Sequence, residues 1–468
     1  MSEKKRNSFS GSFGFVLAAA GSAVGLGNIW RFPYLAAKDG GGLFLVTYLV
    51  LAVTFGFTLM TTEIAIGRKT KQSSLTAYSK IRKNWGFLGV LASLVPMIIL
   101  PFYCVIGGWI IKYFWVYLTG RGSAMAEEGY YDKFIAGQWE PMVMMLIFLV
   151  AVAVIVFMGV NKGIESSSRI IMPVLLLLVI GIAVFCVTIS HTDEDGTVRT
   201  GLQGLKVYLI PNFDGVTLKD FFTVVMDAMG QLFFSLSVAM GILITYGSYV
   251  KDDANLVKSI NQIEICDTFV AFLAGVMVIP AVYTFMGSEG LSASGAGLMF
   301  KSLPKVFNAM GPVVGNIVGC LFFLMVFFAA LTSAVSVMET VVASMMDKFH
   351  WSRLKAAVVE TVIALVGAVI VCLGYNVLYF DIVLPNGVHA QMLDVMDYIS
   401  NNCLMPIVAI ATCLLIGWIV KPGTVIDEVE KTGVKFGRKM LYVVMIKYVA
   451  PILLVILFLK SMGVLTII

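Results

Sequence analysis

Charged residues are scarce in this chain. Asp, Glu, Lys and Arg make up 13% of the 468 residues, and hydrophobic residues make up 59%. Soluble domains carry about 25% charged residues, because water must solvate most of their surface. The low charge therefore argues against a water-soluble enzyme and indicates a chain that lies in a lipid bilayer.

The residues and motifs of several kinds of chemistry are also missing. The seven cysteines are scattered without a C-x-x-C pair, which argues against a disulfide or a metal site. The three histidines lie in or beside connecting segments, which argues against a histidine base inside the bilayer. No G-x-x-x-x-G-K-[ST] loop occurs, so nothing suggests that ATP drives the protein. We therefore expect neither an enzyme nor an ATP-driven pump.

Long runs without any charged residue are abundant. A helix crosses the hydrocarbon core with roughly 20 residues, and runs of that length span residues 7–30, 40–62, 84–111, 141–161, 170–192, 228–250, 268–288, 306–338, 361–380 and 398–420. An eleventh apolar segment, at about 440–465, contains Lys447 and Lys460, whose long side chains can extend towards the interfaces. The sequence predicts an all-α membrane protein with eleven transmembrane helices in a single domain, residues 1–468.

The loops between these runs differ in charge, and this difference predicts the orientation. Basic residues crowd the N-terminus and the loop after the second run, namely Lys4, Lys5, Arg6, Arg68, Lys69, Lys71, Lys80, Arg82 and Lys83. The loops at 121–140 and 193–214 are acidic by comparison. Basic loops stay in the cytoplasm, so we predict a multi-pass protein of the plasma (inner) membrane with its N-terminus inside and its C-terminus outside. The net charge of +5 is explained by topology and needs no nucleic-acid partner.

Two of the predicted spans carry their own helix-breakers. The first reads LAAAGSAVGLGNIWRFPY (17–34), and the sixth reads GQLFFSLSVAMGILITYGSY (230–249). Interrupted helices at matching places in two halves are typical of inverted-repeat transporters. We predict a 5+5 inverted repeat over about 10–192 and 218–420, helices 1 and 6 unwound at mid-membrane, and one extra helix at about 440–465. The alternative for Gly21 and Gly25 is a helix-packing motif.

Unwound backbone is tolerated at membrane depth only where protein or water surrounds it. Its free carbonyls can coordinate a cation, and the N-terminal end of the next half-helix can hold an anionic group. Two such breaks together suit a zwitterion, while Asn28 and Arg31 are polar groups that usually line a functional cavity.

Several motifs resemble one family across essentially the whole chain. They are GSAVGLGNIWRFPY (21–34), DGGG (39–42), FFSLSVAMG (233–241), ITYGSYV (244–250), FFAALTSAVSVME (327–339) and MLDVMDY (392–398). With these motifs the sequence resembles the neurotransmitter:sodium symporter family, in particular its bacterial amino-acid transporters. The resemblance implies a symporter that imports an amino acid with Na⁺, with two ions, by alternating access.

The resemblance also implies two sodium sites. Sodium site 1 comprises Ala23, Asn28, Ser235 and Asp267, completed by the substrate carboxylate. Sodium site 2 comprises Gly21, Val24, Ala329, Thr332 and Ser333. Neutral oxygens suit a monovalent cation, since a divalent site would normally recruit carboxylates. The alternative for Thr332 and Ser333 is ordinary hydrogen bonding between helices.

Asp267 departs from the common pattern of the family, in which many members have Asn and need chloride or a nearby carboxylate. The usual chloride position four residues on is Ala271, while the rest of that charge-compensation pocket matches as Tyr48, Gln231, Ser235 and Asp267. We therefore expect Asp267 to supply the negative charge and transport to require no chloride. The alternative is that Asp267 is a helix-start residue at the interface.

The substrate site implied by the resemblance has mostly apolar members. It comprises Ala23, Leu26, Gly27, Ile99, Tyr103, Phe234, Ser237, Met240, Ser333 and Val337. Tyr103 would donate to the substrate carboxylate, and the carbonyls of Ala23 and Phe234 would accept from the ammonium. No charged side chain belongs to the set, so the expected substrate is a neutral, hydrophobic L-amino acid.

The resemblance implies gates on both sides of the substrate. Arg31 and Asp397 would form the outer ionic gate above Tyr103 and Phe234. The inner gate would comprise Arg6, Asp347 and Tyr249. Exposed pairs of this kind contribute about 0–1 kcal/mol, which suits a contact that must reopen.

Two other functions fit the same residues. In a proton-coupled transporter of the same fold, Asp267 would be the coupling group and uptake would not need sodium. A transporter-like receptor would bind the amino acid without moving it. The Arg6–Asp347 pair favours transport over a receptor.

Overall fold

The structure is a computed structural model that describes residues 8–193, 196–213, 216–292 and 295–465. The first half of the chain forms α1 (Ser12–Ala23), η1 (Gly27–Arg31), α2 (Phe32–Lys38), α3 (Gly42–Leu51), η2 (Ala52–Gly56), α4 (Phe57–Thr70), α5 (Ser74–Ile81), η3 (Lys83–Trp85), α6 (Gly86–Leu118), η4 (Gly122–Ala126), α7 (Tyr130–Ala136), α8 (Glu140–Phe157), η5 (Val160–Glu165), α9 (Ser166–Thr188), β1 (Ser190–Thr192), β2 (Val198–Thr200) and α10 (Gly201–Leu209).

The second half continues with helices and one short hairpin. It forms α11 (Leu218–Ser235), α12 (Ile242–Ser248), α13 (Leu256–Met286), η6 (Glu289–Ser292), α14 (Gly295–Gly297), η7 (Leu298–Ser302), α15 (Leu303–Ala309), α16 (Pro312–Phe349), α17 (Arg353–Leu373), β3 (Ile382–Val383), β4 (His389–Ala390), α18 (Met392–Asp397), η8 (Tyr398–Leu404), α19 (Met405–Leu414), η9 (Leu415–Ile419), α20 (Gly423–Glu430), α21 (Lys439–Val444), η10 (Met445–Val449) and α22 (Ala450–Ser461). The label η marks short π- or 3-10-helical segments, and most of them are π-helical turns that continue into an α-helix.

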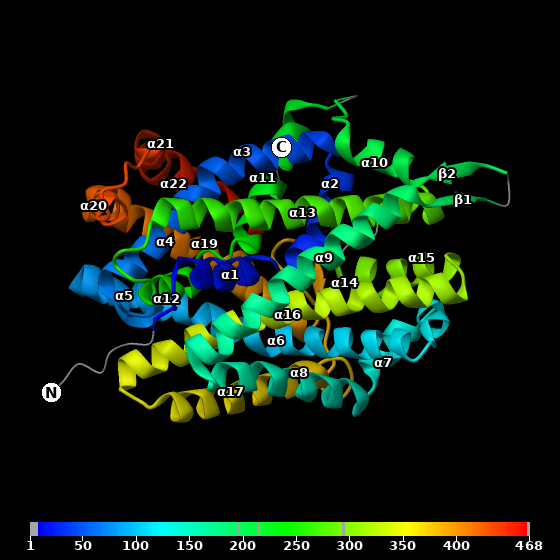
Figure 1. Cartoon of the computed structure of the whole chain (residues 1–468), viewed down its shortest axis with the longest axis horizontal. Coiled ribbons are helices and arrows are strands. Elements are labelled where there is room, and N and C mark those ends of the chain that lie inside the picture. The colour runs from blue at the N-terminus through cyan, green and yellow to red at the C-terminus, as the bar shows by residue number, and fades with distance from the viewer. Residues whose placement is uncertain (1–7, 194–195, 214–215, 293–294, 466–468) are drawn as a thin grey trace.

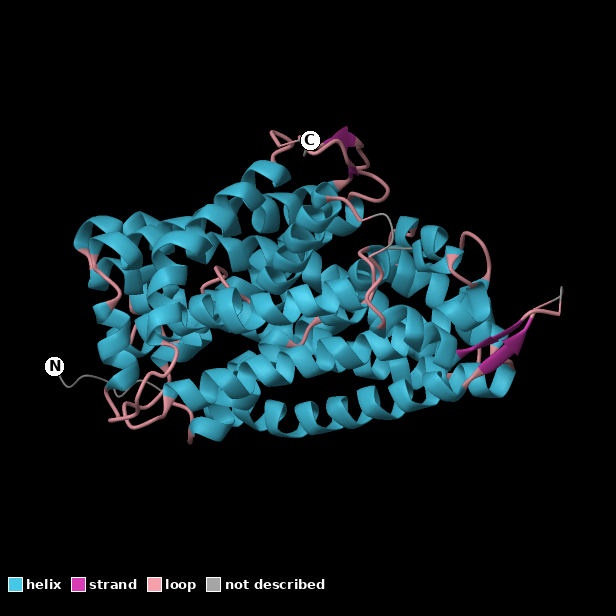
Figure 2. Ribbon diagram, turned by 90° about the horizontal axis from the view of Figure 1, so that it is seen from above, coloured by secondary structure: helices cyan, strands magenta, loops and turns pink. Residues whose placement is uncertain are grey.

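Most long helices run along the long axis of the molecule, so that α13, α1, α16 and α6 lie roughly parallel (Figure 1). Helices α5 and α20 lie at one end of the bundle, and α7, α15 and the β1–β2 hairpin lie at the other. The strands form two separate antiparallel hairpins, β1–β2 and β3–β4, that project from the helical body (Figure 2). The described chain is therefore mostly helical, as the sequence predicts.

Nine helices in the described part of the chain are long and apolar enough to cross a membrane. They cover Gly42–Thr70, Lys83–Leu118, Glu140–Phe157, Val160–Thr188, Leu256–Met286, Pro312–Phe349, Arg353–Leu373, Met392–Ile419 and Lys439–Ser461. A tenth candidate is the pair Ser12–Ala23 and Gly27–Lys38, which is bent by 51°. The prediction of a multi-pass helical membrane protein is confirmed at this level.

The centre of the bundle is built around α6 and α16, which pack against each other along much of their length. Helix α1 lies between α13 and α16, and α12 packs on α4. Small residues allow this close packing: Ala19, Ala329 and Ala330 are fully buried, and their short side chains let the backbones approach. The two interrupted helices are therefore held at the core of the molecule.

Candidate functional site

The first helix is broken near its middle. α1 ends at Ala23 and helical structure resumes at Gly27, while Val24 between them has extended backbone with ψ of 92°. Gly25 fits this break because a Cβ there would lie 2.8 Å from the hydroxyl oxygen of Ser333, closer than real Cβ atoms approach. The break thus brings the backbone of the first helix directly against α16.

A second break separates α11 from α12. α11 ends at Ser235 and α12 begins at Ile242. Between them Ser237, Ala239 and Gly241 adopt left-handed backbone with φ of 53°, 62° and 71°. This conformation costs about 1–2 kcal/mol for a residue with a side chain, so the surrounding structure must hold the segment in place.

Two contacts hold the strained segment. The Ala239 N–H donates to Glu63 Oε1 at 2.7 Å, and both residues are buried. The Ser237 hydroxyl donates to the carbonyl oxygen of Ser22 at 3.2 Å. Because Ser22 belongs to the end of α1, the second break is fastened to the first.

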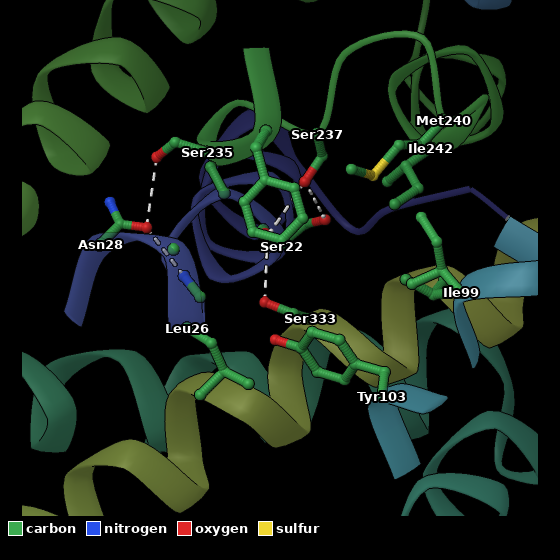
Figure 3. Close-up of a pocket in the computed structure, with 15 residues that line it drawn as sticks. Ser22, Leu26, Asn28, Ile99, Tyr103, Ser235, Ser237, Met240, Ile242 and Ser333 are labelled. Carbon is green, nitrogen blue, oxygen red and sulfur yellow. Dashed lines mark hydrogen bonds between the residues drawn. The ribbon is translucent and has the colours of Figure 1, made fainter. Parts of the chain in front are cut away.

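The two breaks enclose a small buried cavity of about 30 Å³ (Figure 3). All ten residues predicted for the substrate site line it: Ala23, Leu26, Gly27, Ile99, Tyr103, Phe234, Ser237, Met240, Ser333 and Val337. Sequence reasoning missed Ser22, Gly25 and Ile242, which also line it. Ser22 and Gly25 lie inside the glycine-rich stretch that predicted the break, so that signal could have found them.

Apolar and polar groups occupy different parts of the cavity. Figure 3 shows Ile99, Met240 and Ile242 together on one side and Asn28 and Ser235 on the other. The lining residues include no charged side chain in the part of the chain that the structure describes. The chemistry of the cavity suits a neutral ligand with an apolar part.

Hydroxyl groups meet the broken backbone beside Tyr103. The carbonyl oxygen of Ser22 accepts from Ser333 at 3.1 Å as well as from Ser237. The Tyr103 hydroxyl faces the Ser333 hydroxyl and the backbone of Leu26. These groups give the cavity a wall that can donate to and accept from a polar ligand group.

Asp267 is the centre of a buried polar cluster next to the cavity. Asp267 Oδ1 accepts from Asn28 Nδ2 at 2.8 Å and from the Ser235 hydroxyl at 2.8 Å. Its other oxygen accepts from the Tyr48 hydroxyl at 3.4 Å. Among the described residues, no lysine or arginine forms an ion pair with this fully buried carboxylate. A buried carboxylate with donors but without a cation favours binding of a cation beside it.

The position of Asp267 excludes one of its two interpretations from sequence. α13 begins at Leu256, about three turns before Asp267. Asp267 is therefore not a helix-start residue at the interface.

Gln231 is the remaining member of the predicted charge-compensation pocket. Its Nε2 donates to the Gly27 carbonyl at 3.0 Å, and its buried Oε1 has no hydrogen-bond partner among the described residues. Gln231 therefore lies with the first break rather than in direct hydrogen bonding with Asp267.

Residues predicted for the second sodium site come from α1, its break and α16. A Cβ on Gly21 would lie 3.3 Å from the Thr332 Cβ, so the two helices touch at this point. The Thr332 hydroxyl donates to the Ala329 carbonyl at 3.1 Å. All five residues are buried: Gly21, Val24, Ala329, Thr332 and Ser333. The structure brings the set into one region, and its role as an ion site stays a prediction.

The outer gate residues lie near one another without forming an ion pair of 4.0 Å or less between Arg31 and Asp397. Asp397 instead accepts from Asn401 Nδ2 at 2.6 Å, one turn further along the same helical segment. Asp397 and Asp227 are the carboxylates that interact electrostatically with Arg31. The closed outer pair therefore stays a prediction.

Asp227 was not assigned a role from sequence. In the structure it bridges two lysines, accepting from Lys38 Nζ at 2.7 Å and Lys460 Nζ at 2.9 Å. It thereby ties α2 and α22 to α11. No sequence signal could have found this contact, because the partners lie far apart along the chain.

On the inner side, Arg6 lies outside the described residues. Asp347 accepts from the Ser73 backbone N–H at 2.7 Å. Tyr249 donates to Glu339 Oε1 at 2.7 Å, and Arg353 holds Glu339 with two bonds of 2.7 and 2.8 Å. Of the predicted inner residues, Tyr249 thus contacts the buried Glu339, which pairs with Arg353, a residue that sequence reasoning missed.

A bundle of membrane-length helices with two broken helices around a buried cavity is typical of secondary membrane transporters. The family model "Sodium:neurotransmitter symporter family" matches residues 6–124 and 134–467, and the chain belongs to that family. The resemblance seen in the sequence is confirmed.

Individual relatives agree with this assignment. The chain is 30% identical to an uncharacterized sodium-dependent transporter of Bacillus subtilis, with full coverage of both chains. It is 26% identical to the sodium- and chloride-dependent GABA transporter 2 of Mus musculus, over 91% of this chain and 75% of that protein. The crystal structure of MhsT in complex with L-phenylalanine matches with a TM-score of 0.84 and 34% identity, covering 97% of this chain and 100% of that chain.

These findings identify a sodium-coupled membrane transporter rather than an enzyme.

Proposed function

We propose that this protein is a symporter that imports a neutral, hydrophobic L-amino acid together with Na⁺ by alternating access. One observation carries the proposal. Residues from four separated parts of the sequence, all of them in the predicted substrate site, line one cavity between two broken helices. The complex of MhsT with L-phenylalanine supports an amino acid as the ligand class.

The polar ends of an amino acid fit the ends of the broken helices. The Tyr103 hydroxyl and the N-terminal end of η1 would hold the carboxylate, since helix N-termini attract anions. The carbonyls of Ala23 and Phe234, near the C-terminal ends of α1 and α11, would accept from the ammonium. Both charges of the zwitterion would then be compensated without a charged side chain.

The side chain of the substrate would lie against Ile99, Met240, Val337 and Ile242. These residues favour an apolar group, and the flexible thioether of Met240 adapts to aromatic or branched aliphatic shapes. The cavity of about 30 Å³ has room for one or two water molecules. Binding therefore requires the lining side chains to move outward, as expected for a transporter that closes around its substrate.

Two sodium ions would bind beside the substrate. Sodium site 1 would use Ala23, Asn28, Ser235 and Asp267 with the substrate carboxylate, which links the affinities for ion and substrate. Sodium site 2 would use Gly21, Val24, Ala329, Thr332 and Ser333. We propose that the charge of Asp267 replaces chloride, because the carboxylate already lies in hydrogen-bonding contact with Tyr48 and Ser235.

The architecture that goes with this function has eleven spans. The nine long helices, the bent α1–α2 pair and the interrupted α11–α12 pair would give that number. We propose a 5+5 inverted repeat over about 10–192 and 218–420, with an extra helix at about 440–465. The N-terminus would be cytoplasmic, with Arg31–Asp397 closing the outside and Arg6–Asp347 the inside.

Uptake by purified protein in proteoliposomes tests the function. We expect radiolabelled phenylalanine or leucine to accumulate with an inward sodium gradient, and to do so equally when gluconate replaces chloride. Absence of sodium-dependent uptake of every neutral amino acid would rule out the proposal, and a large loss without chloride would rule out the role of Asp267.

A proton-coupled transporter is the second candidate. The observation in its favour is that Asp267 is buried among hydrogen-bond donors without a cationic side chain among the described residues. Uptake driven by a proton gradient in sodium-free buffer would favour this candidate.

A further inference from the structure

A larger cavity, of about 560 Å³, lies outside the substrate site. One wall is a stripe of the α3–η2 segment that includes Leu45, Leu49 and Val53, and the other is a stripe of α13 that includes Ile265 and Phe269. Residues three or four apart share one helix face, so two helix faces meet here without filling the space between them. We call this space the α3–α13 groove; its volume is in the range of ligand-binding sites.

The groove opens towards the lipid. Its wall residues Leu49, Val53, Ile265 and Phe269 are 50%, 47%, 67% and 45% exposed. Both walls belong to helices long and apolar enough to span the membrane. Apolar side chains exposed on such helices contact hydrocarbon chains, so a membrane lipid is the molecule that meets this opening.

One end of the groove is polar. Arg438 reaches it from the segment before α21, donating to the Val53 carbonyl at 3.1 Å and to the side-chain oxygen of Asn261. The guanidinium also lies 3.5 Å from Glu264 Oε2 and over the ring of Phe57 at 3.3 Å from its centroid. These contacts fix a positive charge at the end of an otherwise apolar groove.

Glu264 offers an unused acceptor at the same end. The residue is 5% exposed, and its Oε1 has no hydrogen-bond partner among the described residues. A buried carboxylate oxygen without a donor is costly, and most such groups in proteins have one. Because Glu264 lines the groove, a rotation of its carboxylate would turn this oxygen towards a ligand that donates N–H groups there.

We propose that the α3–α13 groove binds a phospholipid with a primary amine in its headgroup, such as phosphatidylethanolamine. Its phosphate would pair with Arg438, because guanidinium groups bind phosphate well. Its ammonium would donate to Glu264, and an acyl chain would follow the apolar walls from Asn261 to Phe272, a rise of about 16 Å along α13. Phosphatidylcholine has the same phosphate and chains but no N–H donor for Glu264.

The bound lipid would also contact the ion-binding region. Tyr48 and Thr268 line the groove, and the Tyr48 hydroxyl donates to Asp267. Lipid binding is nevertheless measurable without transport, so the inference does not depend on the proposed substrate or ions.

Native mass spectrometry of the full chain in detergent, with phosphatidylethanolamine and phosphatidylcholine of identical acyl chains in equal amounts, tests the proposal. We expect about tenfold preference for the ethanolamine lipid, from the extra charged hydrogen bond. Glu264→Gln, which keeps the volume and removes the charge, should abolish this preference. Equal binding of the two lipids to the wild-type chain, or an unchanged preference in Glu264→Gln, would overturn it.

A pair of tryptophan variants locates the lipid. Leu49→Trp fills the groove, whereas Val46→Trp places the same side chain on the same helix at a lipid-facing position (58% exposed) outside the groove. We expect only Leu49→Trp to reduce bound ethanolamine lipid, by at least fivefold. Equal loss in both variants, a groove occupied by a second copy of the chain in a lipid-free dimer, or displacement by a sterol at equal concentration would each contradict the proposal.

Discussion

The two helix breaks at the cavity are built by different means. The first, from Val24 to Leu26, lies among glycines, and Gly25 permits a close approach to Ser333 that no side chain would allow. The second contains Ser237 and Ala239 in left-handed backbone, a conformation that residues with side chains avoid. The local sequence therefore explains the first break. The second break is imposed, which means that contacts from elsewhere in the fold hold it in an unfavourable conformation.

The breaks meet at Asp267. Asn28, just after the first break, and Ser235, just before the second, donate to the same oxygen of this carboxylate. If the two breaks form one binding site, substituting Asp267, which joins them, should reduce uptake more than a substitution in either break alone.

Asp267→Asn should therefore have the largest effect. The amide keeps the size and loses the charge, and the weakened cation site should reduce sodium-dependent uptake in chloride-free buffer on the order of a hundredfold. Chloride should restore part of the loss, because it would supply the missing charge. The measurement is initial uptake rate against sodium concentration with chloride or gluconate, with Asp132→Asn at an exposed position of α7 as control.

Unchanged sodium dependence in Asp267→Asn would mean that the cluster does not bind the coupling ion. The variant could instead lose uptake, keep its sodium binding and not respond to chloride. Asp267 would then couple the ion to transport without acting as a charge that chloride can replace.

Gly25→Ala tests the local construction of the first break. The new methyl group would lie 2.8 Å from the Ser333 hydroxyl and 3.5 Å from the Tyr103 hydroxyl. We expect roughly tenfold weaker substrate binding, since the Ser333 hydroxyl must move away from its place in the cavity wall. The measurement is binding of labelled phenylalanine by scintillation proximity. Gly181→Ala in α9, which has open space around its Cβ position, is the matched control and should bind normally.

The same contrast explains what the sequence could and could not predict. The charge-free runs predicted the membrane helices, and the clustered glycines predicted the first break. Both signals are local, because each helix must be apolar to lie in hydrocarbon and each glycine frees the backbone at its own position. The apolar members of the cavity followed from the family motifs. No local signal predicts the left-handed backbone of Ala239, because Ala does not favour this conformation. The residue that holds Ala239 in place is Glu63, which lies 176 residues away in sequence.

Long-range charge pairing was equally hidden. Arg353 holds Glu339, and Lys460 holds Asp227, through contacts that join distant parts of the chain. A single sequence gives the residue types but not which partners the fold brings together. The cavity-lining residues missed by sequence, by contrast, lie within or next to the interrupted segments.

Glu63 tests the imposed construction of the second break. Glu63→Ala removes the acceptor for the Ala239 N–H, and leaving that buried donor unpaired should lower the free energy of unfolding by about 1–3 kcal/mol. Glu63→Gln keeps an acceptor oxygen and should retain most of the stability. The measurement is thermal unfolding in detergent by tryptophan fluorescence. Equal stability of the Ala variant and the wild type would show that the segment holds its shape unaided.

Ala239→Gly should have the smallest effect and the opposite sign. Glycine adopts φ of 62° without strain, so the substitution relieves about 1 kcal/mol in the folded state, offset by the greater freedom of glycine in the unfolded chain. We expect stability equal to or up to about 1 kcal/mol above the wild type, whereas Ala151→Gly within α8 should lose about 1 kcal/mol. The same unfolding assay compares the two. If Ala239→Gly loses as much stability as Ala151→Gly, the backbone at Ala239 is not strained and needs no distant contacts to hold it. The distinction between a local and an imposed break then fails.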